Sequence, residues 1–440
     1  MRRIVALAGV AALSLSLTAC GGDDNTSGTT EEGEGTSAAQ PWEGDASEVS
    51  VTTWWEAGSE KLGLEALVEV FNEQNPDTEF VNAALAGGGG SQAKQKLAAD
   101  LAAQNPPDTF QAHAGAELTD YIDAAQIVDI SGLYDELKLR DAFPDSLIDR
   151  LTVDGAIYSV PSNIHRANVV WANPTVIEEA GLDPAQVPAD MDAWIADMEK
   201  IQAAGKTPLT LGMAWTQTQL LETVLIADLG PDAYNGLFDG STAWDSAEVT
   251  TALGHFEKLL TFTDSSLYSE DWEPAMQLVV DGKAAYNVMG DWAIASFDSQ
   301  DKEAGTDYVY FPVPGTDGVF DFLADSFTLP EGAPHPGGTK AWLSTISSKE
   351  GQIAFNKVKG SIPARSDLSD DEKAEFSEYQ QNAMESFGQD IIVSSIAHGA
   401  ALPVKMSNAI NDAVAKFVEG GSSLEDFQAE LVDATSGLGQ

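Results

Sequence analysis

Basic residues are scarce in this 440-residue chain. It has 22 lysines and arginines against 70 aspartates and glutamates, so its formal net charge is −48. Nucleic-acid binding needs basic side chains that neutralise phosphates, and this composition argues against a nucleic-acid partner. The same shortage argues against a polybasic site for a membrane surface. The acidity favours solubility and suits a salty medium that screens self-repulsion.

Cysteine is almost absent as well. Cys20 is the only cysteine, so no disulfide can form within the chain. It follows Arg2–Arg3, an apolar run over 4–17 that is short for a membrane span, and the small residues Thr18–Ala19. This order predicts a lipoprotein signal peptide over 1–20, cleaved before Cys20, whose thiol then carries the lipid. The alternative is a secreted protein with a stray thiol.

Apolar side chains are nearly missing from residues 21–48, which are mostly Gly, Ser, Thr, Asp and Glu. This composition predicts a disordered, acidic and flexible tether. The whole chain is 43% hydrophobic and 21% charged, and it is long enough for two domains with cores of their own. No later run resembles a membrane span, and no repeat of fixed period is found.

The stretch Val51–Glu60 carries the strongest functional signal, because a β-branched run ends there in Trp54 and Trp55. Residues 62–71 then place apolar side chains at helical spacing, which predicts a strand–helix unit of an α/β domain. Ligands of open parallel sheets bind where strands end. Indole faces and carboxylates suit a sugar's C–H faces and hydroxyls. Core packing is the alternative, although adjacent strand residues face opposite ways, so we expect at least one tryptophan at the rim.

Two shorter stretches are ambiguous. Gly87–Gly90 precedes a predicted helix over 91–101 but lacks the Gly-Lys-Ser/Thr ending of a nucleotide-binding loop. We therefore expect backbone that approaches another group closely. Thr109–Gly115 is a predicted strand that presents Gln111 and His113 on one side. This pair is a candidate for holding hydroxyl groups, or else two solvated loop residues.

Several motifs together carry a family resemblance. After the cysteine motif at Cys20, the chain contains Trp54–Trp55, Phe110–Gly115, Val160–Arg166, Gly282–Trp292, Asp325–Phe327 and Lys359–Arg365 in this order. The chain resembles the sugar-binding proteins of ABC importers, family 1 of the extracellular solute-binding proteins. Within that family it is most similar to the glucose/mannose-binding subgroup. The resemblance covers the chain from about Val49 to its end.

The resemblance implies an α/β fold of the periplasmic-binding-protein type II, with two α/β lobes joined by three crossing hinge segments. The amino-terminal lobe would contain 49–165 and 325–360, and the carboxyl-terminal lobe 166–324 and 361–440. The crossings would lie near 163–170, 311–323 and 360–364, and hinge bending would close the lobes. From the residues themselves we expect an extended connector at 311–315 and only helices after the strand that begins near Asp325.

The resemblance also implies a set of sugar-binding residues: Trp54, Trp55, Glu60, Gln111, His113, Asn163, His165, Trp272, Asp325, Lys359 and His398. Trp272 would stack on the sugar ring, opposite the wall formed by Trp54 and Trp55. Gln111 and His113 would bind hydroxyls.

Further roles follow for the other members of this set. Asp325 would accept hydrogen bonds from two hydroxyls, and Lys359 would donate to one or pair with Asp325. His398 would close the site from the carboxyl-terminal helices, and Asn163 and His165 would line the cleft near the first crossing. Glu56 and Glu60 both fit the acidic position after the tryptophans, and we prefer Glu60 because this loop is about one residue longer here. Weaker candidates are Trp215, Asp291 and Trp292.

The predicted function is the extracytoplasmic substrate-binding component of an ABC sugar importer. The expected ligand is a monosaccharide, glucose first and then mannose or galactose, which a monomeric protein would deliver to the membrane permease. Short oligosaccharides and an anchored glycoside hydrolase are the alternatives. No cofactor is expected. No metal is expected either, because no two of the five histidines stand at three- or four-residue spacing.

Overall fold

The computed structural model describes residues 40–85 and 87–438. The predicted signal peptide, Cys20 and most of the predicted tether lie outside these residues. A five-stranded sheet has the order β2–β1–β3–β13–β6. Its strands are β2 Glu79–Asn82, β1 Glu48–Thr52, β3 Thr109–His113, β13 Asp325–Thr328 and β6 Ser159–Pro161. Because β13 pairs antiparallel with β3 and β6, the chain returns to this sheet from Asp325, as expected.

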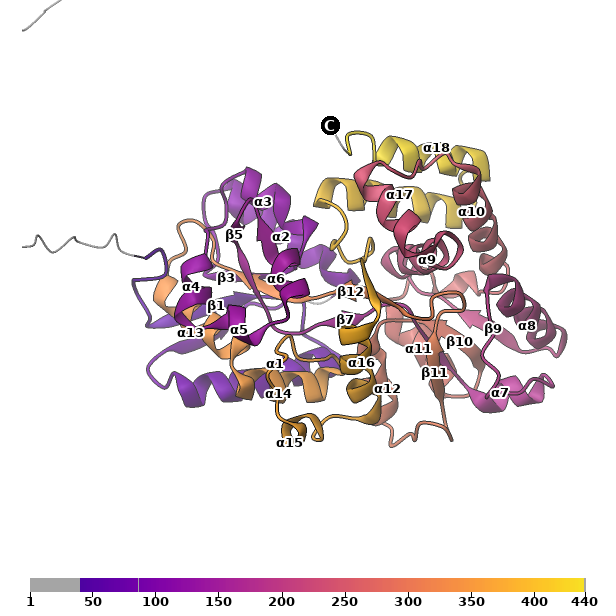
Figure 1. Cartoon of the computed structure of the whole chain (residues 1–440), viewed down its shortest axis with the longest axis horizontal. Helices are drawn as coiled ribbons and strands as arrows, with labels where there is room; N and C mark the ends of the chain where they lie inside the picture. The colour runs from indigo at the N-terminus through magenta and orange to yellow at the C-terminus, as the bar shows by residue number, and fades with distance from the viewer. Residues whose placement is uncertain (1–39, 86, 439–440) are drawn as a thin grey trace, which may run out of the picture. The chain divides into compact units, whose positions relative to one another are not determined.

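A four-stranded sheet forms the second α/β lobe (Figure 1). Its order is β11–β8–β10–β9, with bounds β11 Val309–Pro312, β8 Val169–Ala172, β10 Ala284–Val288 and β9 Thr207–Thr210. The prediction of an extended connector at 311–315 is therefore wrong at its start. Phe311 and Pro312 belong to β11, which pairs antiparallel with β8, and the Phe311 ring is buried in the core of this lobe.

The segments that connect the lobes meet in a three-stranded sheet of order β14–β12–β7. Its strands are β14 Ile391–Ser394, β12 Val319–Leu323 and β7 His165–Arg166. β12 pairs antiparallel with β7, and Ile164 pairs with Ile362, so the three predicted crossings lie side by side. The expectation of only helices after Asp325 is wrong at β14. The β-branched run from Ile391 to Val393 extends there and pairs parallel with β12.

Helices pack on the sheets, and a two-stranded β4–β5 hairpin (β4 Thr152–Val153, β5 Ala156–Ile157) lies outside them. The helices before residue 152 are α1 Gly58–Gln74, α2 Ser91–Ala102, α3 Thr119–Asp123, α4 Ser131–Glu136, α5 Leu139–Ala142 and α6 Asp145–Leu151. Those from 174 to 298 are α7 Pro174–Glu179, α8 Met191–Ala203, α9 Ala214–Asp239, α10 Ala247–Leu260, α11 Trp272–Val280 and α12 Ile294–Asp298. The rest are α13 Pro336–Ser347, α14 Lys349–Lys359, α15 Asp370–Lys373, α16 Glu378–Gln389, α17 Val404–Val418 and α18 Leu424–Ala434. Figure 1 shows α1 lying beside α14, and α17 beside α9 and α18.

The folded body begins before the predicted end of the tether at residue 48. Trp42 is only 3% exposed and belongs to the core of the amino-terminal lobe. It lies against Gly132, where an added Cβ would come within 2.9 Å of the indole. The Asp45 carbonyl accepts the Gly337 N–H at the start of α13. The buried indole of Trp42 and the backbone hydrogen bonds of Asp45 thus hold residues 40–48 on the body, despite the polar composition of this stretch.

Among the residues that the structure describes, no helix combines the length and the apolar character needed to cross a membrane.

The third crossing depends on a glycine, and this gives a testable prediction. Gly360 ends α14 at φ +89°, and an added Cβ would lie 2.6 Å from Ile294 Cγ2 and 3.1 Å from the Asp291 carbonyl. Gly360→Ala should therefore lower the free energy of unfolding by about 2–4 kcal/mol, from left-handed strain plus overpacking. Urea unfolding followed by tryptophan fluorescence measures the change.

A matched control is Gly254→Ala in the interior of α10, where nothing lies within 4 Å of the added Cβ. This substitution should raise the free energy of unfolding by up to about 1 kcal/mol, because alanine is the better helix former. Equal midpoints for the two variants would contradict the role assigned to Gly360.

Candidate functional site

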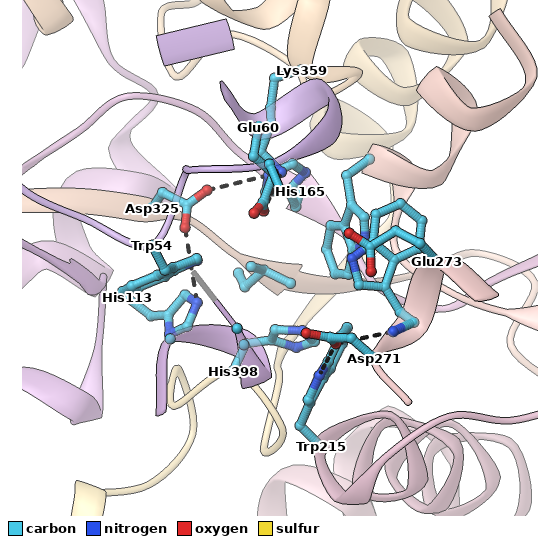
Figure 2. A pocket seen from close by; sticks show the side chains of 17 residues that line it. Trp54, Glu60, His113, His165, Trp215, Asp271, Glu273, Asp325, Lys359 and His398 are labelled. Atoms are coloured by element: carbon cyan, nitrogen blue, oxygen red, sulfur yellow. Dashed lines mark hydrogen bonds and ion pairs between the residues drawn. The ribbon is translucent and has the colours of Figure 1, made fainter. Parts of the chain in front are cut away.

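A cavity of about 160 Å³ lies where the ends of several strands meet the start of α11 (Figure 2). Four tryptophans line it, namely Trp54, Trp215, Trp272 and Trp292. Its ionisable side chains are Glu60, Asp271, Glu273, Asp325, His113, His165, His398 and Lys359, and Ala57, Gly87, Gly89, Gly90 and Leu323 complete the lining. The cavity therefore combines flat apolar faces with many hydrogen-bonding groups.

Strand pairing places the amino-terminal part of this lining. β13 runs antiparallel to β3 with Asp325 directly opposite His113. Trp54 follows the end of β1, which lies next to β3 in the same sheet. The ends of these strands therefore gather side chains that are more than 200 residues apart in sequence, which is where open α/β sheets bind ligands.

The Asp325 carboxylate is the most heavily bonded group at the cavity. Its Oδ1 accepts Gln111 Nε2 at 2.8 Å, and its Oδ2 accepts Asn163 Nδ2 at 2.8 Å and lies 3.3 Å from His165 Nε2. Burial alone would raise the pKa of Asp325. The hydrogen bond and charge of His165, with Lys359 and His113, lower this pKa below its ordinary value instead. Asp325 is therefore ionised and can accept only.

Gln111 and Asn163 do not line the cavity, contrary to their expected role on the sugar. Both are buried behind Asp325 and use their amides to hold its carboxylate. Gln111 Oε1 also accepts from the Thr53 hydroxyl, and the Asp325 N–H donates to Asn163 Oδ1 at 2.8 Å. The prediction found a polar cluster at the correct strand ends. It was wrong to assign Gln111 and Asn163 to the ligand, because their amides donate to Asp325.

The two adjacent tryptophans point to different places, as their alternation predicts. Trp54 lines the cavity, whereas Trp55 is 0% exposed and packs on Phe327 and Phe355, with ring centroids 5.5 and 4.6 Å away. The expected place of Trp55 in the cavity wall is therefore corrected: it belongs to the core. Trp54 also explains the glycine loop, because an added Cβ on Gly90 would lie 2.6 Å from its ring.

Glu60, rather than Glu56, faces the cavity from the first turn of α1. Its Oε1 lies 3.2 Å from Lys359 Nζ, at the end of α14. Lys359 thus pairs with Glu60 and not with Asp325, which was one of the two roles expected for Lys359. Burial raises the pKa of Glu60, and the charge of Lys359 offsets only part of this shift.

The carboxyl-terminal lobe supplies the opposite wall through the start of α11. Trp272 and Glu273 lie there beside Asp271, whose Oδ1 accepts the Trp215 indole N–H at 2.9 Å. Burial, together with the charges of Asp271 and Glu60, raises the pKa of Glu273 to about 7. Neither Asp271 nor Glu273 was predicted from the sequence to be a site residue. Asp271 and Glu273 flank Trp272 at the start of a helix, and this position in the sequence could have identified them as site residues.

Three of the five histidines converge on the cavity. His113 Nδ1 bonds Glu117 at 2.7 Å, and His165 Nδ1 bonds Asp291, a weaker candidate that does not line the cavity. Burial lowers the pKa of His165, but the Asp291 carboxylate outweighs it and leaves this pKa raised. His398 comes from the loop after β14, not from a helix as expected, and burial lowers its pKa well below the ordinary value.

Trp215 and Trp292, named as weaker candidates, both line the cavity next to His398, with ring centroids 5.6 and 5.3 Å from it. Elsewhere, Glu48, Asp108 and His335 place ligand-type atoms within 4.8 Å of one another. Asp108 already accepts the Ser50 and His335 backbone N–H groups at 2.7 Å, so its oxygens serve the fold.

Fold and site together define a two-lobed α/β binding protein with a solute cavity at the lobe junction. The model of the bacterial extracellular solute-binding proteins matches residues 55–353, and the chain belongs to this family. An uncharacterized ABC transporter extracellular-binding protein of Pyrococcus horikoshii is 34% identical over 373 residues, 84% of this chain and 83% of the relative. A probable sugar-binding periplasmic protein of Brucella melitensis is 31% identical over 394 residues, 88% and 91% of the two chains.

More distant relatives carry the names of particular sugars. A xylose/arabinose-binding protein of Haloferax volcanii is 28% identical over 91% of this chain and 87% of its own, and a glucose-binding protein of Saccharolobus solfataricus is 24% identical over 70% and 59%. A solved chitin oligosaccharide binding protein superposes with a TM-score of 0.77 at 20% identity and covers 90% of this chain and 100% of its own. These comparisons confirm the family and the two-lobed fold inferred from the motifs.

The Lys359–Glu60 pair gives a prediction for stability. The side chain of Lys359 is 2% exposed and that of Glu60 is 24% exposed. Lys359→Met would leave the largely buried Glu60 carboxylate without its cation and should lower the free energy of unfolding by about 1–3 kcal/mol. The loss is smaller than for a fully buried pair, because water still reaches Glu60. Thermal unfolding at neutral pH measures the loss.

Lys340→Met serves as the control, because Lys340 and Glu136 form an exposed pair at 2.6 Å with side chains 33% and 48% exposed. This change should alter the free energy of unfolding by less than about 1 kcal/mol. If both variants lost the same small amount, the pair at the cavity would not stabilise the protein.

Proposed function

We propose that this protein is the extracytoplasmic substrate-binding component of an ABC sugar importer and that it captures a monosaccharide in the cavity. The observation that carries the proposal is the pairing of tryptophan faces with acceptor carboxylates around one small space. Indole faces bind the C–H faces of a pyranose, and carboxylates accept its hydroxyls. A neutral sugar would use both the indole faces and the carboxylates, whereas a charged solute would not use both kinds of group.

The size of the cavity supports a single sugar ring. At about 160 Å³ it is smaller than the roughly 300–1,000 Å³ pockets that hold drug-sized ligands. Glucose is the first candidate, then mannose or galactose, in line with the motif resemblance and with relatives named for glucose or pentoses. About five to eight hydrogen bonds of roughly 0.5–1.5 kcal/mol each, with one aromatic stack, would give a micromolar site after ordering costs.

The ligand would enter between open lobes, which close over it by bending at the three crossings. Trp54, Glu60, His113 and Asp325 would bind it from one lobe, and Trp272 from the other. The closed form would dock on the transmembrane permease. The function is binding and delivery, so no bond of the sugar is broken.

A short oligosaccharide is the second candidate, and one observation favours it. A smaller cavity of about 80 Å³ shares Gly89 and Trp215 with the first, and its lining includes the polar side chains of Ser91, Lys94 and Asn408. A second sugar ring could occupy it beside Trp215. The solved relative named for chitin oligosaccharides has the same fold.

A panel of sugars tests the assignment. Glucose, galactose, mannose and xylose are tested, and each one that binds should, at about 100 times its dissociation constant, add about 2.7 kcal/mol of stability and raise the melting temperature. Trp272→Ala should weaken the best ligand at least about tenfold in calorimetry, because the stacking face is lost. Trp272→Phe, which keeps a smaller ring, should weaken it less.

Melting of both Trp272 variants without sugar shows whether the body is intact. A shift with disaccharides alone would replace the monosaccharide with the second candidate. Cleavage of any disaccharide would overturn the binding role, since a carboxyl of raised pKa, Glu273, and an ionised carboxylate, Asp325, in one cavity are also the groups that a glycosidase uses.

We also propose that a lipid on Cys20 anchors the mature monomer to the outer face of the cell membrane. The support is the motif at the start of the chain, which lies outside the described residues. The lipid would hold a chain of −48 net charge at an anionic bilayer that would otherwise repel it. Cys20→Ser should move the protein from the membrane fraction to the soluble fraction and remove the lipid mass. Unchanged membrane association would contradict the anchor.

A further inference from the structure

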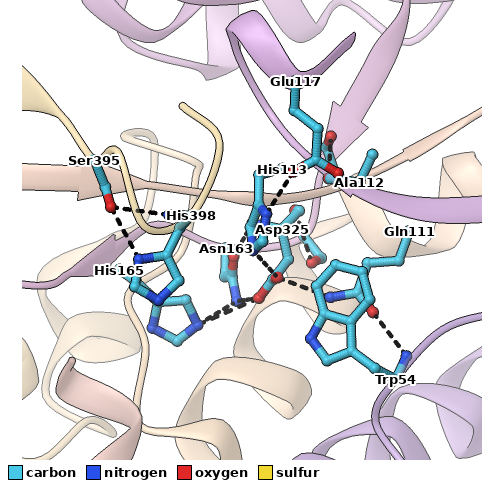
Figure 3. A network of polar contacts seen from close by, with 12 residues as sticks. Trp54, Gln111, Ala112, His113, Glu117, Asn163, His165, Asp325, Ser395 and His398 are labelled. Carbon is cyan, nitrogen blue, oxygen red and sulfur yellow. Dashed lines mark hydrogen bonds and ion pairs between the residues drawn. The ribbon is translucent and has the colours of Figure 1, made fainter. Parts of the chain in front are cut away.

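The loop that carries His398 is held from behind by a buried glutamate. Glu222 of α9 is 0% exposed, and its Oε2 accepts the backbone N–H groups of Ile396 at 2.6 Å and Ala397 at 2.8 Å. Its two oxygens lie 2.9 and 3.0 Å from the Ser395 hydroxyl. Ser395 in turn lies 2.9 Å from His398 Nδ1 (Figure 3). A continuous chain of contacts therefore joins Glu222 to the cavity.

A second buried carboxyl, Asp321, lies next to Glu222 and decides where the proton of this pair resides. Asp321 of β12 is also 0% exposed, and neither of its carboxyl oxygens has a protein hydrogen-bond donor. Burial and the neighbouring Glu222 raise the pKa of Asp321, and burial raises the pKa of Glu222. Two adjacent buried carboxyls do not both ionise, and Asp321, whose pKa is raised well above its ordinary value, is the one that keeps the proton.

The other charged or titratable groups near Glu222 and Asp321 do not change the assignment of the proton to Asp321. Arg166 of β7 lowers the pKa of Asp321, but its guanidinium donates to Asn168 and to the Val319 carbonyl and lies 3.6 Å from Asp390. The Tyr234 hydroxyl donates to the Ser394 carbonyl. Neither group supplies a hydrogen bond to Asp321.

This arrangement fixes the direction of every hydrogen bond toward His398. Glu222 is the ionised partner and accepts two backbone N–H groups, so the single proton of Ser395 is donated to Glu222. The Ser395 oxygen then accepts the His398 backbone N–H at 3.2 Å and the proton of His398 Nδ1. Because burial keeps the ring neutral, Nε2 has no proton. Nε2 is buried without a protein partner, and His398 lines the cavity.

We propose that Glu222 is a positioning residue that acts through Ser395 to hold His398 in its Nδ1–H tautomer, so that Nε2 accepts a hydrogen bond from a ligand hydroxyl. The remaining site histidines are committed to carboxylates, since His113 contacts Glu117 and His165 contacts Asp291 and Asp325. His398 thus adds an uncharged acceptor to a cavity whose other acceptors are carboxylates. A hydroxyl that meets Nε2 must donate, which selects its orientation.

Nitrogen-15 NMR of the imidazole rings in the labelled protein reads the tautomer directly. Five histidines give few signals, and His398→Gln assigns the one of interest. The wild type should show a protonated Nδ1 and a bare Nε2 at His398. Glu222→Gln keeps an acceptor oxygen for Ser395 and should retain this pattern. Glu222→Met removes the acceptor, and the Ser395 proton should turn to Nδ1 and move the ring proton to Nε2.

The signals of His255 and His335, which lie away from the cavity, report whether the variants keep their fold. If Glu222→Met also shifts these signals, Ser395→Ala takes its place, because it cuts the same contact chain with a smaller change. A bare Nδ1 in the wild type, or an unchanged His398 pattern in Glu222→Met or its Ser395→Ala replacement, would overturn the proposal.

A second arm measures affinity for D-glucose and rests on the proposed function. Glu222→Met should weaken glucose binding by about tenfold, because the hydrogen bond from the sugar to His398 Nε2 is lost. Glu222→Gln keeps this hydrogen bond and should weaken binding by less than about threefold. Absence of glucose binding by the wild type would reject the sugar assignment while the NMR result on Glu222 stands. Equal affinity of the Met variant and the wild type would overturn the role of Nε2.

Discussion

The buried carboxylate of Asp325 is the constraint on which the rest of the structure depends. It stands where β13 returns to the first sheet, and amides from β3 and from the first crossing hold both of its oxygens. An ionised group with so little exposure is stable only if its partners stay in place. The strand register that sets Asp325 opposite His113 therefore positions the ligand cavity and ties the crossing near Asn163 to the sheet.

The cavity is built from pairs of groups that keep one another in a defined state. Lys359 neutralises Glu60, and Asp291 accepts from His165. Glu117 holds His113, and although burial raises the pKa of Glu117, the charges of Lys94 and His113 outweigh burial and lower it to about 2. These contacts fix charge and orientation before any ligand arrives. Preorganisation of this kind reduces the cost of binding, because few side chains must be ordered by the ligand.

Much of the fold could be predicted from the sequence, because its signals are local. The apolar spacing after Trp55 marked α1, the β-branched runs marked the strands, and the four glycines marked a loop that passes close to Trp54. The failures have physical causes. Trp42 is buried although its neighbours in sequence are polar, and the short β-branched run at Ile391–Val393 forms β14 by pairing with the distant strand β12. Pairing over long sequence distances is not encoded in local composition.

The sequence by itself determined most of the elements, the family and the residue types at the strand ends, since these follow from side-chain period and motif. Only the tertiary structure decided which side chains meet the cavity. Trp54 faces it and Trp55 does not, and Gln111 and Asn163 serve Asp325 rather than a ligand. The reason is that strands and helices far away in the chain supply the hydrogen-bond partners and the packing surfaces of these side chains. The register of these strands determines which side chains are used by the protein and which face the cavity.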